Sequence, residues 1–265
     1  MAAQEPSGVV LVATNGATRV ITMNRPEARN ALTREVLSGV RSALDSASSD
    51  GAVRCVVLTG AAGHFCSGAD LRQTLAQDPQ LFDHLDAYMD EFHAVIKSVV
   101  RCAKPTIAMM DGAAVGFGAD LAFACDLRVA TSRAYVQEKF VHIGLMPDGG
   151  GSFWLPRLVG TSRAMQMILL AEKVGAEELA RLGVVARVVE PEALEASTLA
   201  LARKIESGPP LAFAAIKRAV YASWGSVEDA LRREREEQLK LLRSADVMEG
   251  VAAWMQKREP QFTGR

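Results

Sequence analysis

The chain has 265 residues, with 30 lysines and arginines against 31 aspartates and glutamates, and 49% of its residues are hydrophobic. This composition fits one large globular domain, or one domain with an appendage. Its near-zero net charge gives nothing that points to nucleic acid. The sequence contains no apolar stretch as long as a membrane span and no secretory signal, so we expect a cytoplasmic location. Its four cysteines show no CxxC spacing, and we expect their thiols to be reduced.

The first two-thirds of the chain alternates between predicted strands and helices. Apolar runs at residues 9–13 and 19–23 flank Asn15-Gly16, which predicts a β-hairpin. A polar loop then leads into a helix with Thr33 as its N-cap and an apolar stripe at Val36, Leu37, Val40 and Leu44. Further strands are predicted at 53–59, 105–110 and 127–130, and a helix at 81–100, so we expect an α/β fold.

The final third of the chain is different. From residue 161 onward apolar residues recur at helical spacing, with a strand-like break at 184–189 and charged helices at 228–242 and 247–257. The clearest linker is Gly208-Pro209-Pro210. We therefore predict an α/β core over residues 1–200 and a helical subdomain over residues 201–265.

Residues 105–126 carry the strongest functional signal, because they combine a strand, a glycine turn and a helix start. Glycine lets the backbone approach a ligand closely, and the first N–H groups of a helix attract negative charge. The Gly-Lys-Ser/Thr of a P-loop is missing, and Leu121 stands where a dinucleotide fingerprint needs its third glycine. The pattern favours an oxyanion over a nucleotide, with Asp120 in the first helical turn as a candidate proton carrier.

This stretch closely resembles the signature of the crotonase (enoyl-CoA hydratase/isomerase) superfamily, through Ile107-Ala108, Asp111-Gly112-Ala113-Ala114-Val115-Gly116-Phe117-Gly118-Ala119-Asp120-Leu121-Ala122 and Cys125-Asp126. Residues 24–32, 67–71, 144–151 and 257–262 also follow the order of that family. The resemblance implies a spiral of ββα repeats with a helical C-terminal region that forms homotrimers or dimers of trimers. It also implies an acyl-CoA substrate whose coenzyme A belongs to the substrate, with no separate cofactor.

The chemistry shared by this family is an enolate next to a thioester. Two backbone N–H donors stabilise its negative oxygen, each worth roughly 3–4 kcal/mol. The resemblance assigns these donors to Ala69 and Phe117. Many relatives carry glycine at the position of Phe117, so we expect its ring to narrow the acyl pocket. The alternative is that the glycines of these motifs serve only tight packing.

The acids of the site decide which reaction follows. Family hydratases use two glutamates; the first position holds Asp120 here, and the second holds Phe140. Hydration needs a base for water and an acid for the α-carbon, so the loss of one weakens that activity. Glu138 lies two residues before Phe140. In a strand its side chain would point to the same face as position 140 but would lie one residue pair further along the strand, so we expect it not to replace the missing acid.

Asp148 offers another carboxyl group, just before Gly149 and a predicted helix at 152–158. It would serve as an N-cap, or as the proton shuttle found in the family branch that this segment resembles, the epoxyphenylacetyl-CoA isomerases. That branch often has an amide at the position of Asp120, which here either restores a second acid or complements the helix dipole. We predict an enoyl-CoA isomerase using Asp148; the alternatives are a hydratase using Asp120 and Asp148, and a non-catalytic acyl-CoA-binding protein.

Contacts with the substrate and its coenzyme A are expected from residues of the same motifs, namely Ala28, Asn30, Gly68, Asp70, Leu71, Arg72, Gly116 and Phe140. Arg25 and Arg29 either meet the phosphates or are solvated. Asp70 is expected to brace its loop through backbone hydrogen bonds. Cys66 near His64 is interpreted as an apolar loop cysteine, and we find no group with metal-ligand spacing.

Overall fold

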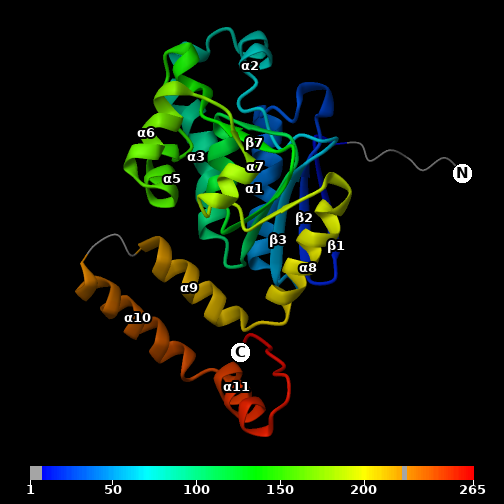
Figure 1. Ribbon diagram of the computed structural model, residues 1–265, viewed down its shortest axis with the longest axis vertical. Helices are drawn as coiled ribbons and strands as arrows, with labels where there is room; N and C mark the ends of the chain where they lie inside the picture. The colour runs from blue at the N-terminus through cyan, green and yellow to red at the C-terminus, as the bar shows by residue number, and fades with distance from the viewer. Residues whose placement is uncertain (1–7, 223–225) are drawn as a thin grey trace, which may run out of the picture.

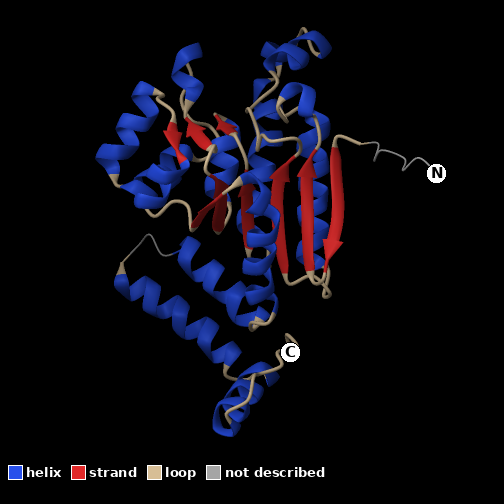
Figure 2. Ribbon diagram, turned by 45° about the vertical axis from the view of Figure 1, so that its right-hand side comes forward, coloured by secondary structure: helices blue, strands red, loops and turns tan. Residues whose placement is uncertain are grey.

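The computed structural model describes residues 8–222 and 226–265 (Figure 1). Its main feature is a six-stranded sheet in the order β1-β2-β3-β4-β6-β9, and Figure 2 shows strands of this sheet side by side in red. The strands are β1 Val10–Asn15, β2 Thr18–Met23, β3 Cys55–Gly60, β4 Thr106–Met110, β6 Leu127–Thr131 and β9 Arg187–Val189. Only β1 is antiparallel to its neighbour, and the other pairs are parallel.

The predicted hairpin is confirmed. Asn15 pairs with Thr18 at its end, and Gly16 has φ +60°, the left-handed region that such a turn needs. The predicted strands at 53–59, 105–110 and 127–130 are confirmed to within two residues, and β9 lies in the strand-like segment 184–189. β3 is buried from Cys55 to Thr59, as expected of a parallel strand covered on both faces.

A second, smaller sheet was not predicted. It joins β5 Ala113–Val115, β7 Tyr135–Gln137 and β8 Val174–Gly175 in the order β5-β7-β8. Two or three residues give no readable periodicity, so only their partners fix these strands. This sheet holds the chain where it enters the glycine turn, because β5 ends just before Gly116, β7 pairs with β5, and the Gly116 N–H donates to the Gln137 carbonyl at 2.8 Å.

Helices cover both faces of the large sheet. α1 Arg34–Ser49 is capped by the Thr33 side chain, which accepts a hydrogen bond from the Val36 N–H at 3.3 Å, and its predicted apolar stripe is buried. α3 Leu85–Arg101 packs beside it. The other helices of this body are α2 Leu71–Gln77, α4 Phe117–Ala124, α5 Gly151–Val159, α6 Thr161–Leu170, α7 Ala176–Arg181 and α8 Leu194–Glu206, with 3-10 turns η1 Pro26–Ala28, η2 Leu81–Asp83, η3 Lys139–Ile143 and η4 Pro191–Ala193.

The last helices leave this body. α8 spans residue 200 and packs against the sheet, where Leu194 and Ala202 share a core with Val57 and Ile107. α9 Pro210–Ala222, α10 Val227–Leu241 and α11 Ala245–Gln256 then extend away from it (Figure 1), which confirms the predicted helices at 228–242 and 247–257. The division at residue 200 stays a prediction.

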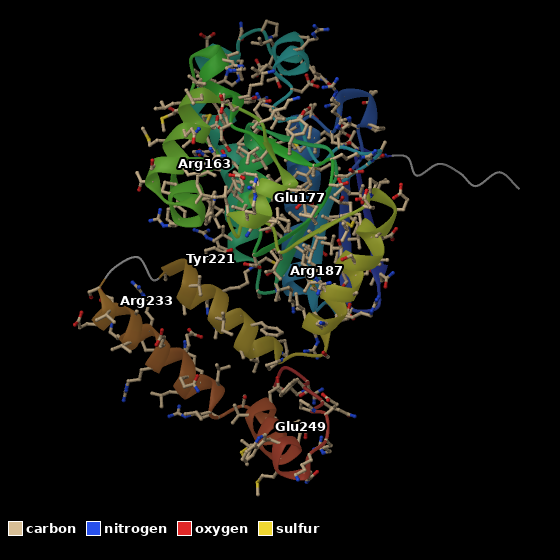
Figure 3. The ribbon with its side chains drawn as sticks, in the orientation of Figure 1. Arg163, Glu177, Arg187, Tyr221, Arg233 and Glu249 are labelled. Atoms are coloured by element: carbon tan, nitrogen blue, oxygen red, sulfur yellow. The ribbon has the colours of Figure 1, made fainter. Side chains whose placement is uncertain are left out.

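One partly buried carboxylate anchors α9 to the body. The two Asp126 carboxyl oxygens accept the Tyr221 hydroxyl at 2.8 Å and the Lys217 ammonium at 2.7 Å (Tyr221 is labelled in Figure 3). The Tyr221 ring also meets Trp154 edge to face at 5.8 Å. In the described ranges 8–222 and 226–265, no helix has both the length and the apolar composition to cross a membrane.

Candidate active site

The central turn has the predicted order of strand, glycine and helix, with β5 inserted between β4 and Gly116. Gly116 has φ +54° and ψ −127°, a conformation that favours glycine, and α4 begins at the next residue. All eight residues of α4 are buried. The Ala119 and Asp120 N–H groups donate to the Gly116 carbonyl, at 2.8 and 3.2 Å. The N–H groups of Phe117 and Gly118 precede the first acceptor of the helix and lie at its positive end.

The two predicted oxyanion donors lie in adjoining segments. Leu32 bonds to Gly68 and Asp70 through its N–H and carbonyl, at 2.8 and 2.9 Å. Because successive groups of an extended segment point to opposite sides, the Ala69 N–H faces away from Leu32. A Cβ on Gly68 would lie 2.8 Å from the Val115 carbonyl oxygen and 3.7 Å from the Phe117 nitrogen, so the two turns are in contact.

The Phe117 ring fills the interior rather than standing in solvent. Its exposed fraction is 2%, and it meets Phe92 of α3 edge to face with ring centroids 4.8 Å apart. Phe140, at the position of the missing glutamate, is 9% exposed, and its ring would lie 3.8 Å from a Cβ on Gly116. Both rings therefore give the turn an apolar surrounding.

Asp120 lies behind this turn and is fully buried. One carboxyl oxygen accepts the Gly149 N–H at 2.8 Å, and the other has no hydrogen-bond partner among the described residues. Burial, together with the charge of Asp148, raises the pKa of Asp120 to about 8. A raised pKa favours the protonated form of Asp120, which is suited to act as an acid.

Asp148 is not an N-cap, so that alternative is wrong. The N-cap of α5 is Gly150, and no side chain caps this helix. One oxygen of the Asp148 carboxyl is buried without a partner in the described part of the chain, and burial raises the pKa of Asp148 to about 6, with His93 opposing the shift. The His93 Nε2 lies 3.0 Å from the Asp148 carbonyl oxygen, which requires the proton on Nε2.

Glu138 is the residue that sequence analysis set aside. The chain leaves β7 at Gln137 and turns into η3, so strand periodicity does not extend to this position. The Glu138 side chain is 1% exposed, and burial with the charges of Asp120 and Asp148 raises its pKa to about 9. Three carboxyl groups from three segments thus influence one another in one buried region.

His93 and Tyr88 of α3 were also missed. Tyr88 is buried, and burial raises the pKa of its hydroxyl, to which the charge of Asp148 also contributes. The sequence does show Tyr88, Phe92 and Val95 at helical spacing on one apolar face. Such spacing predicts that the residues pack in the core, and it does not by itself indicate a functional site.

The Asn24–Leu32 loop is braced from within. The Asn30 side chain is fully buried and bonds to the Arg25 N–H and to the carbonyls of Ala61 and His64, so it is committed to the loop rather than to a ligand. Arg25 donates to the Asp70 carboxylate at 3.0 Å. This pairing removes Arg25 as a free cation for phosphate.

Asp70 braces its own segment, as predicted, and caps α2 by accepting the Gln73 N–H at 3.0 Å. Leu71, Arg72 and Arg29 are exposed and Ala28 is partly exposed, so these side chains are open to a ligand. Cys66 is buried, and burial raises the pKa of its thiol to about 12, which rules out a thiolate nucleophile. The described residues contain no group of histidines, cysteines and acids fit for a metal ion.

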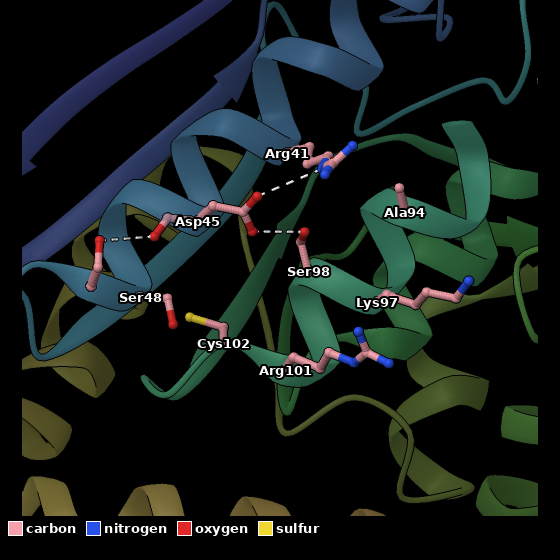
Figure 4. Close-up of a pocket in the computed structure, with 9 residues that line it drawn as sticks. Arg41, Asp45, Ser48, Ala94, Lys97, Ser98, Arg101 and Cys102 are labelled. Carbon is pink, nitrogen blue, oxygen red and sulfur yellow. Dashed lines mark hydrogen bonds and ion pairs between the residues drawn. The ribbon is translucent and has the colours of Figure 1, made fainter. Parts of the chain in front are cut away.

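A hollow of about 440 Å³ lies elsewhere, between α1 and α3 (Figure 4). Its carboxylate, Asp45, is already bound by Arg41 and by the Ser98 hydroxyl at 2.8 Å. None of the predicted site residues lines it, and it contains no buried carboxyl group. This hollow is therefore separate from the three carboxyl groups.

The glycine turn at Gly116 thus lies beside buried acids on an α/β fold, and comparison with known proteins shows which class of enzyme has this fold. The family model for enoyl-CoA hydratase/isomerase matches residues 13–265. The chain belongs to the enoyl-CoA hydratase/isomerase family and has the crotonase fold.

Individual relatives carry both activities in their names. A probable enoyl-CoA hydratase of Rhodobacter capsulatus is 42% identical over 247 residues, covering 93% of this chain and 94% of the relative. The 1,2-epoxyphenylacetyl-CoA isomerase of Escherichia coli is 34% identical, covering 92% and 94%. A crystal structure of an enoyl-CoA hydratase from a Polaromonas species superposes with a TM-score of 0.91 at 33% identity, covering 96% and 100%.

Proposed function

We propose that this enzyme is an isomerase that moves a proton between carbons of an acyl-CoA thioester, with Asp148 as the proton shuttle. The observation that carries the proposal is the Asp148 carboxyl, which caps no helix and has one buried oxygen without a hydrogen-bond partner among the described residues. Burial raises the pKa of Asp148 to about 6 and raises the pKa values of Asp120 and Glu138 further, which favours Asp148 as the ionised member of the three. A base with a pKa just below the working pH is well suited to proton abstraction.

The chemical step follows from these positions. The Asp148 carboxylate accepts a proton from the carbon next to the thioester carbonyl, and the C–H electron pair enters a conjugated enolate. The enolate oxygen accepts hydrogen bonds from the Ala69 and Phe117 N–H groups, and no side chain has to ionise to provide them. Return of the proton at another carbon re-forms the carbonyl and leaves the double bond moved.

A hydratase is the second candidate, favoured by the Asp120 acid. In that reaction Asp148 takes a proton from water while Asp120 gives one to the α-carbon. The names of the relatives include both a hydratase and an isomerase, which supports either activity. Phe140, in place of the second family glutamate, is the reason we place hydration second.

Proton NMR in deuterated water separates these candidates. Wild-type enzyme would be incubated with crotonyl-CoA and with a 3-enoyl-CoA, and we expect double-bond migration with deuterium entering the acyl chain. Asp148→Asn should lower the rate by about 10²–10⁴-fold, as expected for loss of a general base. A 3-hydroxyacyl product from wild type would support the hydratase instead. If Asp148→Asn stays fully active while Asp120→Asn is dead, the assignment of the shuttle is wrong.

We also propose that α9 to α11 mediate a homotrimer or a dimer of trimers. Large apolar side chains are exposed there, including Trp254 at 81%, Met255 at 72% and Met248 at 70%. A soluble monomer rarely exposes a contiguous surface of this kind. Light scattering after gel filtration would test this, and a monomeric mass at micromolar concentration would contradict it. The cytoplasmic location stays an expectation.

A further inference from the structure

The position of the Asp148 carboxyl depends on the backbone of the loop before α5. One of its oxygens, Oδ1, is buried and has no hydrogen-bond partner among the described residues. Three glycines follow Asp148, and the second of them, Gly150, has φ +96°. Glycine has more backbone freedom than any other residue, so a loop of this composition keeps one position only where other segments bind its backbone.

Two side chains from different helices bind the same peptide group of this loop. The Asp148 carbonyl oxygen lies 3.0 Å from the Nε2 of His93, in α3, and a carbonyl oxygen can only accept, so Nε2 is the donor. The N–H of the next residue, Gly149, donates to Asp120 Oδ2, in α4, at 2.8 Å. Because the Asp148 carbonyl and the Gly149 N–H belong to one planar unit, the two hydrogen bonds together fix the orientation of that plane.

The orientation of this plane determines where the carboxyl lies. The plane contains the Asp148 Cα, and only two side-chain torsions separate that atom from the carboxyl oxygens. A residue with less backbone freedom cannot replace Gly149, because its Cβ would lie 2.6 Å from the Asp120 Cβ. The close packing that requires glycine here therefore leaves the restraint to hydrogen bonds from outside the loop.

The same part of α3 also contacts the glycine turn. Phe92, the residue before His93, meets the Phe117 ring edge to face with ring centroids 4.8 Å apart. Two consecutive residues of α3 thus contact Phe117, the expected donor to the enolate oxygen, and Asp148, the proposed base. A change in the contact with either one alters the distance between donor and base.

We propose that His93 is a positioning residue for the proton shuttle: its Nε2–H holds the Asp148–Gly149 peptide from the side of α3, while Asp120 holds it from the side of α4. His93 exchanges no proton with the substrate and acts only through Asp148. The inference rests on the proposed function, because it needs Asp148 to be the base.

The test compares three replacements of His93 with a 3-enoyl-CoA as substrate. His93→Leu removes the donor, and we expect kcat to fall about 10- to 100-fold with KM within about twofold, since the base is displaced and substrate binding is not. His93→Gln places an amide Nε2 donor the same number of bonds from the backbone and should restore kcat to within about threefold of wild type. The amide of His93→Asn is one bond too short and should leave kcat low.

Lys97→Leu is the matched control, because Lys97 is exposed one turn further along α3 (labelled in Figure 4), and it should leave kcat unchanged. A His93→Leu enzyme with wild-type kcat overturns the proposal. A His93→Gln enzyme as slow as His93→Leu overturns it as well, because the hydrogen bond is then not what the site needs.

A double-mutant cycle separates positioning from general damage to the fold. Asp148→Asn has no base to position, so adding His93→Leu should leave its residual rate unchanged within about twofold. A further tenfold loss in the double variant would mean that His93 acts apart from Asp148, and the proposal would fail. If Asp148→Asn itself keeps full activity, the proposed function has failed, an outcome distinct from a slow Asp148→Asn beside a fast His93→Leu.

A second measurement reads the hydrogen bond directly. The chain has four histidines, so ¹⁵N NMR of histidine-labelled enzyme gives few signals, and those of His93 are the ones lost in His93→Gln. At a pH where the ring is neutral, we expect the proton on Nε2. A neutral ring with its proton on Nδ1 cannot donate to the Asp148 carbonyl and would overturn the proposal, whatever the folding of His93→Leu.

Discussion

Replacing Gly149 by alanine adds one Cβ atom, which should lower both the thermal stability and the activity of the enzyme. The added Cβ would lie 2.6 Å from the Asp120 Cβ, 2.9 Å from Asp120 Oδ2 and 2.9 Å from an edge carbon of Phe117. Carbon atoms in contact prefer about 3.5–4.0 Å, so these neighbours must move by up to about 1 Å. Overpacking of this kind costs about 1–3 kcal/mol. For a domain of this size, each kcal/mol lowers Tm by roughly 2–4 °C.

The same shift displaces the Asp120 carboxyl and the Phe117 ring, and a displacement of about 1 Å in a site can lower activity by about 10²-fold. Tm by circular dichroism and kcat with a 3-enoyl-CoA measure the two effects. Gly51→Ala is the control, because no heavy atom lies within 4 Å of the added Cβ and the backbone of Gly51 lies outside the left-handed region. A Gly149→Ala enzyme with the Tm and kcat of Gly51→Ala would refute the packing argument.

Two further predictions concern stability. The raised pKa values of Asp120 and Glu138 mean that the folded state binds more protons than the unfolded state between their unfolded values, about 4, and their folded values, about 8 and about 9. Stability should therefore fall as pH rises through this window, and Asp120→Asn should flatten that fall in thermal unfolding between pH 5 and 8; an unchanged slope would contradict it. Arg128→Met should lower the urea midpoint, because the buried Arg128 guanidinium donates to the carbonyls of Cys125, at the end of α4, and Val184. Each carbonyl left unpaired costs about 1–3 kcal/mol, and a midpoint equal to wild type would refute this role.

Much of the fold follows from local signals in the sequence. The Asn15-Gly16 hairpin, the Thr33 cap and the buried parallel strands are determined by turn geometry, capping and apolar runs, and each was confirmed. α2 and the three short strands were missed, because two to seven residues carry too little periodicity and depend on their neighbours.

The position of Asp148 was predicted from its motif, but its role as a candidate N-cap was not ruled out by sequence. Only the structure shows that Gly150 takes the cap position. Similarly, the sequence presents Arg25 as a free cation, and the fold pairs it with Asp70 from a distant loop.

By itself, the sequence determined the family and the turn from strand to glycine to helix, and it pointed to Asp120 and Asp148, because these features depend on glycines and small residues at fixed local spacing. The tertiary structure decided the surroundings of the acids. Asp120, Glu138 and Asp148 come from α4, the end of β7 and the loop before α5, and their pKa values separate only because folding buries them together by different amounts. That mutual burial depends on distances between segments, which no local pattern in the chain encodes.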